Sequence, residues 1–298
     1  MTGGTPLILC LGAIHWDVIA HAALPLTRGG DVPGRISRLP GGVAFNVARA
    51  LVRQGLRARL ISATGSGSEG DALIDEAQRA GVGVDYILRR PDDAADRYLA
   101  IEDETGLVAA VADSRTLEAA ASALLTVAVA CLSDPPEALL VESNLPAATL
   151  TALSAVPALA RIDLRLLPAG PGKARRLLPL LGHPRATVYL NRAEAEEIMS
   201  RPLKDAADAA RAVRAAGACR VVVTDGPRAV VAASREGECS ALPPQVRVAR
   251  VTGAGDTFVA AHMAAELRGL PVEAALAAAL AAAAHHISAP AAATGETP

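Results

Sequence analysis

The octapeptide VTGAGDTF, residues 251–258, is the stretch of this sequence that most constrains its fold and function. An apolar, alanine-rich segment follows it and predicts a helix that starts at Gly253, Ala254 and Gly255. Small residues let a ligand approach the backbone, and the unpaired N–H groups of a first helical turn favour anions. Asp256 in this turn is either a capping residue or a general base, which would take an alcohol proton while the amides hold a phosphoryl group. The rest of the chain favours the second interpretation.

The composition predicts a single α/β domain over residues 1–298 in a cytoplasmic protein. The net charge of −2 and the pI near 6.3 offer no basic surface to nucleic acid or to an anionic membrane. No apolar run is long enough to span a bilayer. The four cysteines form no C-x-x-C pair, which argues against a disulfide framework or a cysteine metal site: they are Cys10, Cys131, Cys219 and Cys239. We therefore expect a small-molecule partner, and neither nucleic acid nor membrane.

Apolar runs separated by helical patterns predict a doubly wound sheet. Leu7–Leu11 is a continuous apolar run that ends at Gly12 and reads as a buried parallel strand. Further strands are expected at Arg59–Thr64, Ala138–Glu142, Leu159–Ile162, Ala186–Leu190 and Arg220–Val223, and near Ala229–Ala232. Because helical segments alternate with these strands, we predict a three-layer α/β/α fold with a mostly parallel central sheet.

Polar residues follow several of the predicted strands where each one ends. Asp17 comes shortly after the first strand, and the later ones are Asn144, Asp163, Asn191 and the run Thr224-Asp225-Gly226. Ligands of open α/β sheets bind at the carboxyl ends of the strands. One such residue would be explained as a turn or cap, but a series of them predicts a single ligand-binding edge.

Two glycines precede the first helix. Gly41 and Gly42 break a strand-like segment, and a helix is predicted from Val43 with a stop at Gly55. Asn46 lies in its first turn, where an asparagine is mildly unfavourable unless it has a polar task. We therefore count Asn46 and the glycine pair as candidate ligand contacts.

Two segments outside the main pattern predict a small additional sheet. Arg35–Leu39 alternates polar and apolar residues, and Arg97–Asp113 reads as a β-hairpin. These strands, within about residues 15–40 and 96–113, are expected to form a lid over the ligand. Asp113 ends the hairpin, where it either points back at the site or is a solvated strand-end residue.

The loop GSGSEG at residues 65–70 permits a different interpretation. It matches G-x-G-x-x-G between a strand and a helix, the pattern of a dinucleotide site, with Asp85 as the distant acidic residue. Asp85 lies only 15 residues past Gly70, after the next turn, and the first βα unit lacks the pattern. An oxidoreductase is therefore the less favoured alternative.

Taken together, these motifs resemble the PfkB, or ribokinase-like, family of sugar and nucleoside kinases. GGVAFNVARAL at residues 41–51 resembles its N-terminal signature, and residues 251–259 resemble its C-terminal one. Asn191-Arg192-Ala193-Glu194 matches the N-x-x-E of the family, and the loop at residues 65–70 resembles a glycine-bearing loop common in these kinases. The resemblance runs in order from about Leu7 to Ile287. It implies a β lid, ATP as phosphoryl donor and Mg²⁺ as cofactor.

The resemblance also implies a role for each matching residue. The base would be Asp256, and the anion hole would be Gly253, Ala254 and Gly255. The acceptor hydroxyls would be held by Asp17, Gly41, Gly42 and Asn46, because unpaired polar groups there would reject other ligands. Mg²⁺ would be organised through water by Asn191 and Glu194, since it prefers oxygen ligands. The nucleotide phosphates would be contacted by Thr224 and Gly226.

Two departures from the family pattern lie in the segments expected to serve ATP, the phosphoryl donor. The sixth position of the T-x-G-x-x-G loop is Ala229 instead of glycine. Many members carry an aspartate two residues before the threonine of the C-terminal signature, where it helps to bind a monovalent cation, and here that position is Arg250. A potassium requirement is therefore doubtful.

Within the family, local features resemble the pseudouridine kinases. They are the signature without its preceding acid, the hairpin sequence of residues 98–113, and Glu142-Ser143-Asn144 after a strand. On this resemblance, Asp113 and Asn144 would contact the base or ribose of a nucleoside. The alternatives are a kinase for ribose, another sugar or an ordinary nucleoside, and an inactive member that only binds a sugar or nucleotide. A homodimer joined through lid strands is a further expectation.

Overall fold

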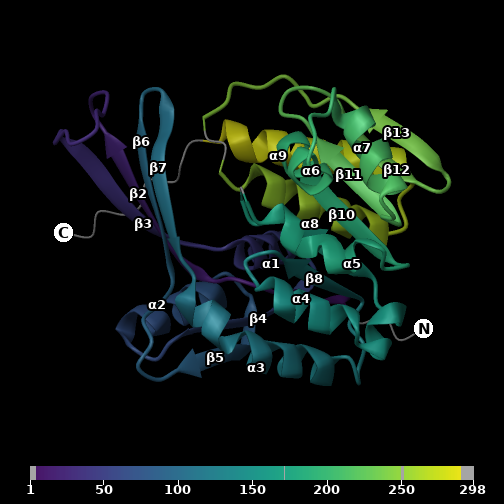
Figure 1. Ribbon diagram of the computed structural model, residues 1–298, viewed down its shortest axis with the longest axis horizontal. Helices are drawn as coiled ribbons and strands as arrows, with labels where there is room; N and C mark the ends of the chain where they lie inside the picture. The colour runs from purple at the N-terminus through teal and green to yellow at the C-terminus, as the bar shows by residue number, and fades with distance from the viewer. Residues whose placement is uncertain (1–4, 171, 250–251, 290–298) are drawn as a thin grey trace.

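The structure is a computed structural model that describes residues 5–170, 172–249 and 252–289, built around a nine-stranded sheet (Figure 1). Its strand order is β13-β12-β11-β10-β9-β8-β1-β4-β5. Strands β11 to β5 in this order run parallel, and β12 and β13 add an antiparallel edge. The strands are β1 (Leu7–Leu11), β4 (Arg57–Gly65), β5 (Gly83–Arg90), β8 (Ala138–Glu142), β9 (Leu164–Leu167), β10 (Ala186–Asn191), β11 (Arg220–Thr224), β12 (Val230–Ser234) and β13 (Gly237–Ala241).

Helices cover both faces of this sheet, and each face has its own cluster of buried hydrophobic side chains. One face packs against α1 (Val43–Arg53), α2 (Ser68–Arg79), α8 (Ala254–Leu267) and α9 (Val272–Ser288). The other packs against α3 (Arg115–Cys131), α4 (Ala147–Ser154), α5 (Leu178–Leu181), α6 (Arg192–Met199) and α7 (Ala206–Ala215), with 3-10 turns at Pro157–Arg161 and Ala174–Leu177. The predicted three-layer fold is confirmed. Among the described residues, no helix is long and apolar enough to cross a bilayer.

A second, four-stranded sheet stands apart from the main one, at the upper left of Figure 1. Its order is β3 (Gly34–Gly41), β2 (His15–Ala22), β6 (Arg97–Asp103) and β7 (Gly106–Asp113). Strand β2 pairs in parallel with β6, whereas the two outer pairings are antiparallel. We call it the small sheet. Asp17, predicted to follow the first strand directly, is therefore part of a strand of this small sheet.

The strand predicted at Leu159–Ile162 is wrong. These residues belong to the 3-10 turn Pro157–Arg161 and its end, and the strand of this region is β9, which begins at Leu164. The apolar pattern misled because β9 carries a fully buried Arg165, which pairs with Asp163. Asp163 therefore lies at the amino end of β9, and not at the carboxyl edge where we expected a ligand contact. Strands β5 and β13 were not predicted either.

Candidate active site

The helix predicted after the small residues begins where expected. Gly253 is the N-cap of α8 and has a left-handed φ of 81°, which glycine adopts without strain. Thr257 N donates the first helical hydrogen bond, to Gly253 O at 3.0 Å. No side chain caps this end of the helix. The amides of the first turn therefore face outward without a helical acceptor, as an anion site requires.

Asp256 occupies this turn but does not cap it. The side chain of Asn46, on α1, donates a hydrogen bond to its carboxylate. The pKa of Asp256 is raised to about 7. Burial is the largest cause and the charges of Glu142 and Asp17 add to it, while the Asn46 hydrogen bond and the positive charge of Arg49 oppose the rise. A carboxyl group with such a pKa can accept a proton near neutral pH.

Arg49 fixes the orientation of Asn46. Its Nη2 donates to Asn46 Oδ1 at 3.1 Å, which leaves the amide nitrogen of Asn46 to face Asp256. The Arg49 guanidinium also stacks over the Phe45 ring at 5.2 Å. Arg49 lies one turn after Asn46 on the same helix, and this spacing is the signal in the sequence for the contact.

Glu142 is a second carboxylate to which sequence reasoning gave no role. It ends β8 and is completely buried, with Oε1 accepting from Ala13 N and Oε2 from Asn144 N, both at 2.6 Å. A Cβ on Gly12 would lie 2.2 Å from Oε1, so the chain needs glycine there. Burial raises the pKa of Glu142, and its N–H partners and the charge of Lys173 lower it. The signal in the sequence for a role of Glu142 was its place at the end of an otherwise apolar strand.

The two glycines before α1 pack against different groups, Gly41 against Asp17 and Gly42 against the Ala13 backbone. A Cβ on Gly41 would fall 2.2 Å from Asp17 Oδ2, and one on Gly42, whose φ is 102°, would fall 2.4 Å from the backbone oxygen of Ala13. His15 Nε2 holds the other Asp17 oxygen, Oδ1, at 3.0 Å. Close approach thus explains both glycines. It brings Asp17 into the electrostatic reach of Asp256, whose pKa it raises.

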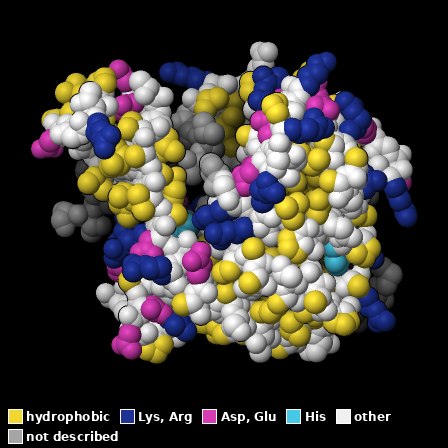
Figure 2. All heavy atoms as spheres, in the orientation of Figure 1, with side chains coloured by type: hydrophobic (Ala, Val, Ile, Leu, Met, Phe, Trp, Pro, Cys, Tyr) yellow, Lys and Arg dark blue, Asp and Glu magenta, His cyan; other side chains and the backbone are white. Residues whose placement is uncertain are grey.

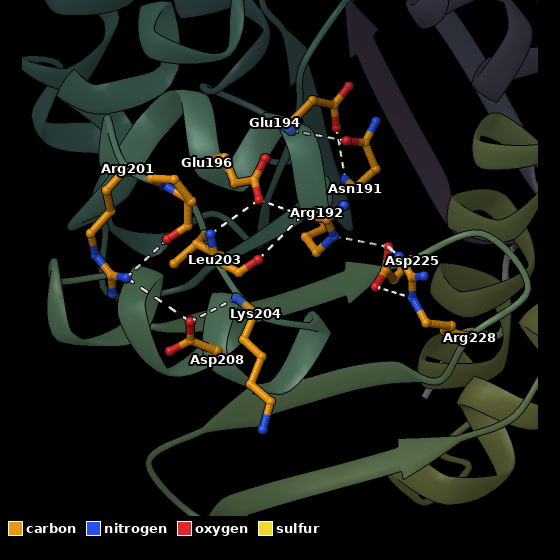
Figure 3. Close-up of polar contacts among 11 residues, drawn as sticks. Asn191, Arg192, Glu194, Glu196, Arg201, Leu203, Lys204, Asp208, Asp225 and Arg228 are labelled. Atoms are coloured by element: carbon orange, nitrogen blue, oxygen red, sulfur yellow. Dashed lines mark hydrogen bonds and ion pairs between the residues drawn. The ribbon is translucent and has the colours of Figure 1, made fainter.

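Two of the residues predicted to contact the nucleotide end neighbouring strands, Asn191 on β10 and Thr224 on β11. Figure 3 shows Asn191 and its partners. Asn191 and Thr224 are opposite each other in the strand register. Asn191 Oδ1 accepts from Glu194 N at 2.9 Å, and Glu194 Oε2 accepts from Asn191 N at 2.8 Å, which is a capping box for α6. N-x-x-E therefore has a local structural role, and its role toward a metal remains a prediction.

Ion pairs hold the loop after Thr224. Asp225 is buried and accepts from Arg192 Nε at 3.1 Å and from Arg228 Nε and Nη2 at 2.7 Å each (Figure 3). Gly226, next in the loop, is exposed with a φ of 59°. The Arg228 clamp thus fixes this turn although Ala229 replaces the glycine of the family pattern. The other departure, Arg250, lies outside the described residues.

The two predicted nucleoside contacts are both held by protein partners. Asp113 ends β7, and Arg115 binds its two oxygens at 2.8 and 2.7 Å, which lowers the pKa of the carboxyl group. Asn144 is buried, accepts from Lys173 Nζ at 2.6 Å, and bonds to Glu142 through its side chain. Asn144 therefore bridges Lys173 and Glu142. Contacts of Asp113 or Asn144 with a nucleoside remain predictions.

Packing explains two of the three glycines of residues 65–70, Gly65 and Gly70. A Cβ on Gly70 would lie 1.9 Å from Gly65 O, because Gly70 already belongs to α2 and packs on the end of β4. The small sheet is attached here, since Trp16 Nε1 donates to Glu69 O at 3.2 Å and Arg97 pairs with the Glu69 carboxylate. These contacts serve the fold and need no pyrophosphate to account for them.

A carboxyl group with a pKa of about 7, beside an open helix N-terminus at one edge of a doubly wound sheet, is suited to phosphoryl transfer to an alcohol. The comparisons agree. The family described as pfkB family carbohydrate kinase matches residues 5–298, and the chain belongs to it. It is therefore a phosphotransferase with an alcohol group as acceptor, which excludes the oxidoreductase interpretation.

Among known proteins, the chain is similar to the pseudouridine kinase of Escherichia coli K12, with 26% identity over 268 residues that cover 89% of this chain and 85% of the relative. A carbohydrate kinase from Agrobacterium tumefaciens is 30% identical with a TM-score of 0.76, covering 94% of this chain and 90% of that one. The fold also matches an Arabidopsis thaliana ribokinase complexed with ribose and ATP, at a TM-score of 0.81 and 17% identity, covering 97% and 95% of the two chains.

Proposed function

We propose that this enzyme transfers the γ-phosphoryl group of ATP to the 5′ hydroxyl of a nucleoside, and that the nucleoside is pseudouridine. The observation that carries the kinase mechanism is Asp256, with a pKa of about 7 and a hydrogen bond to Asn46 at the open start of α8. The choice of nucleoside rests on the sequence features of residues 98–113 and 142–144, and on the similarity to a pseudouridine kinase.

The residues divide the reaction between them. Asp17 and Asn46 bind the acceptor hydroxyls and orient the 5′ oxygen toward the γ-phosphorus. Asp256 takes the hydroxyl proton as the new O–P bond forms, and the bond to the β,γ-bridging oxygen breaks with its electron pair leaving on ADP. The N–H groups of Ala254 and Gly255 hold the charge on the transferred group.

The residues at the ends of β10 and β11 fit ATP and Mg²⁺. Thr224 and Gly226 would contact the phosphates, on a loop that Asp225 fixes through its arginines. Only Oε2 of Glu194 is used in the capping box, so its other oxygen can hold a water ligand of Mg²⁺. The described residues contain no group of three or more His, Cys, Asp or Glu side chains that could bind a metal directly. When bound, Mg²⁺ would neutralise phosphate charge.

ADP release with Mg-ATP across an acceptor panel tests this function. The panel contains pseudouridine, uridine, adenosine, ribose, fructose and no acceptor. We expect kcat/KM for pseudouridine to exceed that for uridine by at least about tenfold, because an unpaired buried polar group penalises the wrong base. A preference for a free sugar would leave the Asp256 mechanism intact and reject the nucleoside. ATP binding without turnover of any acceptor would favour a non-catalytic family member.

The pH dependence follows from the raised pKa of Asp256. The base must be ionised to accept a proton, so kcat/KM for the acceptor should fall about tenfold per pH unit below pH 7 and level off above it. Initial rates between pH 5 and pH 9, with ATP saturating, measure this. A profile that stays flat down to pH 5 would contradict a base with a pKa of about 7.

The small sheet is the element we assign to the lid, and it also suggests how two copies would associate. Asp17 faces one side of it, and Val18, Leu99 and Val111 share the opposite side in register. Leu99 and Val111 are 41% and 65% exposed, and Figure 2 shows hydrophobic side chains gathered over this sheet. We infer a homodimer through this face, which sedimentation equilibrium would test. The cytoplasmic location expected from the unpaired cysteines also remains a prediction.

A further inference from the structure

Lys173 is one of two lysines in an arginine-rich sequence. The chain has 29 lysines and arginines, and only Lys173 and Lys204 are lysines. Arginine and lysine are not equivalent, because the ammonium group is compact, has three freely directed donors and changes its pKa readily when buried. A lysine retained in a half-buried position of so arginine-rich a chain therefore suggests a task that suits an ammonium group.

The topology puts Lys173 between the two halves of the site. It follows β9, and β9 lies between β8, which ends in Glu142, and β10, which ends in Asn191. The acceptor and base are on the β8 side of this edge, and the predicted nucleotide contacts are on the β10 side. In the strand order, Lys173 therefore lies between the proposed acceptor contacts and the proposed nucleotide contacts.

The side chain of Lys173 is held by a hydrogen bond to a neutral group. Its Nζ donates to the neutral Oδ1 of Asn144 at 2.6 Å, and among the residues that the structure describes it forms no ion pair. Burial lowers the pKa of the ammonium group, and the negative charge of Glu142 opposes this effect. A half-buried cation with a neutral partner gains most from a bound anion. The nearby Arg176 is different, since its Nη1 is used on the carbonyl oxygen of Asn144.

We propose that Lys173 Nζ binds the γ-phosphoryl group of ATP and stays with it during transfer, so that it neutralises the charge opposite the amides of α8. Asn144 then acts as a positioning residue, because its side chain forms hydrogen bonds with both Lys173 Nζ and Glu142. Lys173 keeps its proton throughout, and the acceptor proton goes to Asp256. This inference rests on the proposed kinase function and adds the residue that holds the group being transferred.

Calorimetric titration of Lys173→Met with ATP and with ADP, without acceptor, tests the γ-phosphate contact. We expect the affinity for ATP to fall about tenfold or more and that for ADP to change less than about twofold, since a charge-assisted hydrogen bond is lost only with ATP. The kcat of the variant should fall about 100-fold. Lys204→Met is the matched control. Lys204 is exposed, and its side chain points away from the ion-pair cluster in Figure 3. This substitution should change neither the nucleotide affinities nor kcat.

Two further variants separate binding from folding. Lys173→Gln keeps a donor for Asn144 without the charge and should show the same selective loss for ATP. Lys173→Arg keeps the positive charge but should still have a kcat well below that of the wild type, because the longer, planar guanidinium group cannot take the position of the ammonium group. Equal weakening of ATP and ADP, or a kcat within about twofold of the wild type, would overturn the role of Lys173. If the wild type phosphorylates no acceptor, the kinase proposal fails, while the ratio of ATP to ADP affinity still decides the γ-phosphate contact.

Discussion

Replacing Asp256 by asparagine is expected to lower kcat at least about 100-fold while the protein stays folded and binds ATP. The amide has the size of the carboxyl group but cannot accept the hydroxyl proton, and general-base catalysis contributes about 10²- to 10⁴-fold. Steady-state rates with saturating acceptor and ATP measure the loss. Turnover within about tenfold of the wild type would remove Asp256 from the mechanism.

The stability of the same variant distinguishes a base from a helix-capping residue. Because folding raises the pKa of Asp256 to about 7, the native protein holds a proton that the unfolded chain has released between about pH 4 and pH 7. Stability is therefore lost as the pH rises through this window, and Asp256→Asn should have a higher Tm than the wild type at pH 8. Asp208→Asn, in the first turn of α7, is the control and should lower Tm or leave it unchanged.

The parts of this site that the sequence predicted are those with local signals. Gly253 and Asp256 predict the start of α8, and the glycine pair with Asn46 predicts the start of α1. These predictions succeed because turn geometry and helix ends are set by neighbouring residues. The parallel sheet followed from apolar runs alternating with helical patterns. Both signals are patterns of residues that lie close together in the sequence.

The parts that were missed depend on distant contacts. Glu142 has its role because Ala13, 129 residues away, donates to it, and Lys173 meets Asn144 across 29 residues. Strand β9 was misplaced because the partners of Arg165 in the fold, Tyr189 and Glu266, make a buried charge tolerable that the local pattern excludes. No periodicity in the sequence contains these pairings.

Gly41→Ala is expected to raise the KM for the acceptor about 10- to 100-fold and to change the KM for ATP less than about twofold. The new Cβ would lie 2.2 Å from Asp17 Oδ2, so the carboxylate must move away from the position in which it would bind a hydroxyl group. A hydrogen bond to a charged group is worth about 1.5 to 3 kcal/mol, which sets this range. Initial rates with each substrate varied in turn measure the two constants.

Gly41 is a more selective probe than its neighbour because of what each would strike. At Gly42 the added atom would meet the Ala13 backbone at a φ of 102°, so that substitution should damage the fold itself. At Gly41 it meets only the end of a side chain, which can turn aside while the fold persists. Gly67→Ala, with nothing within 4 Å of its Cβ, controls for the loss of a glycine. If Gly41→Ala raised both KM values equally, Asp17 would not be specific to the acceptor, and its place in the site would have to be reassigned.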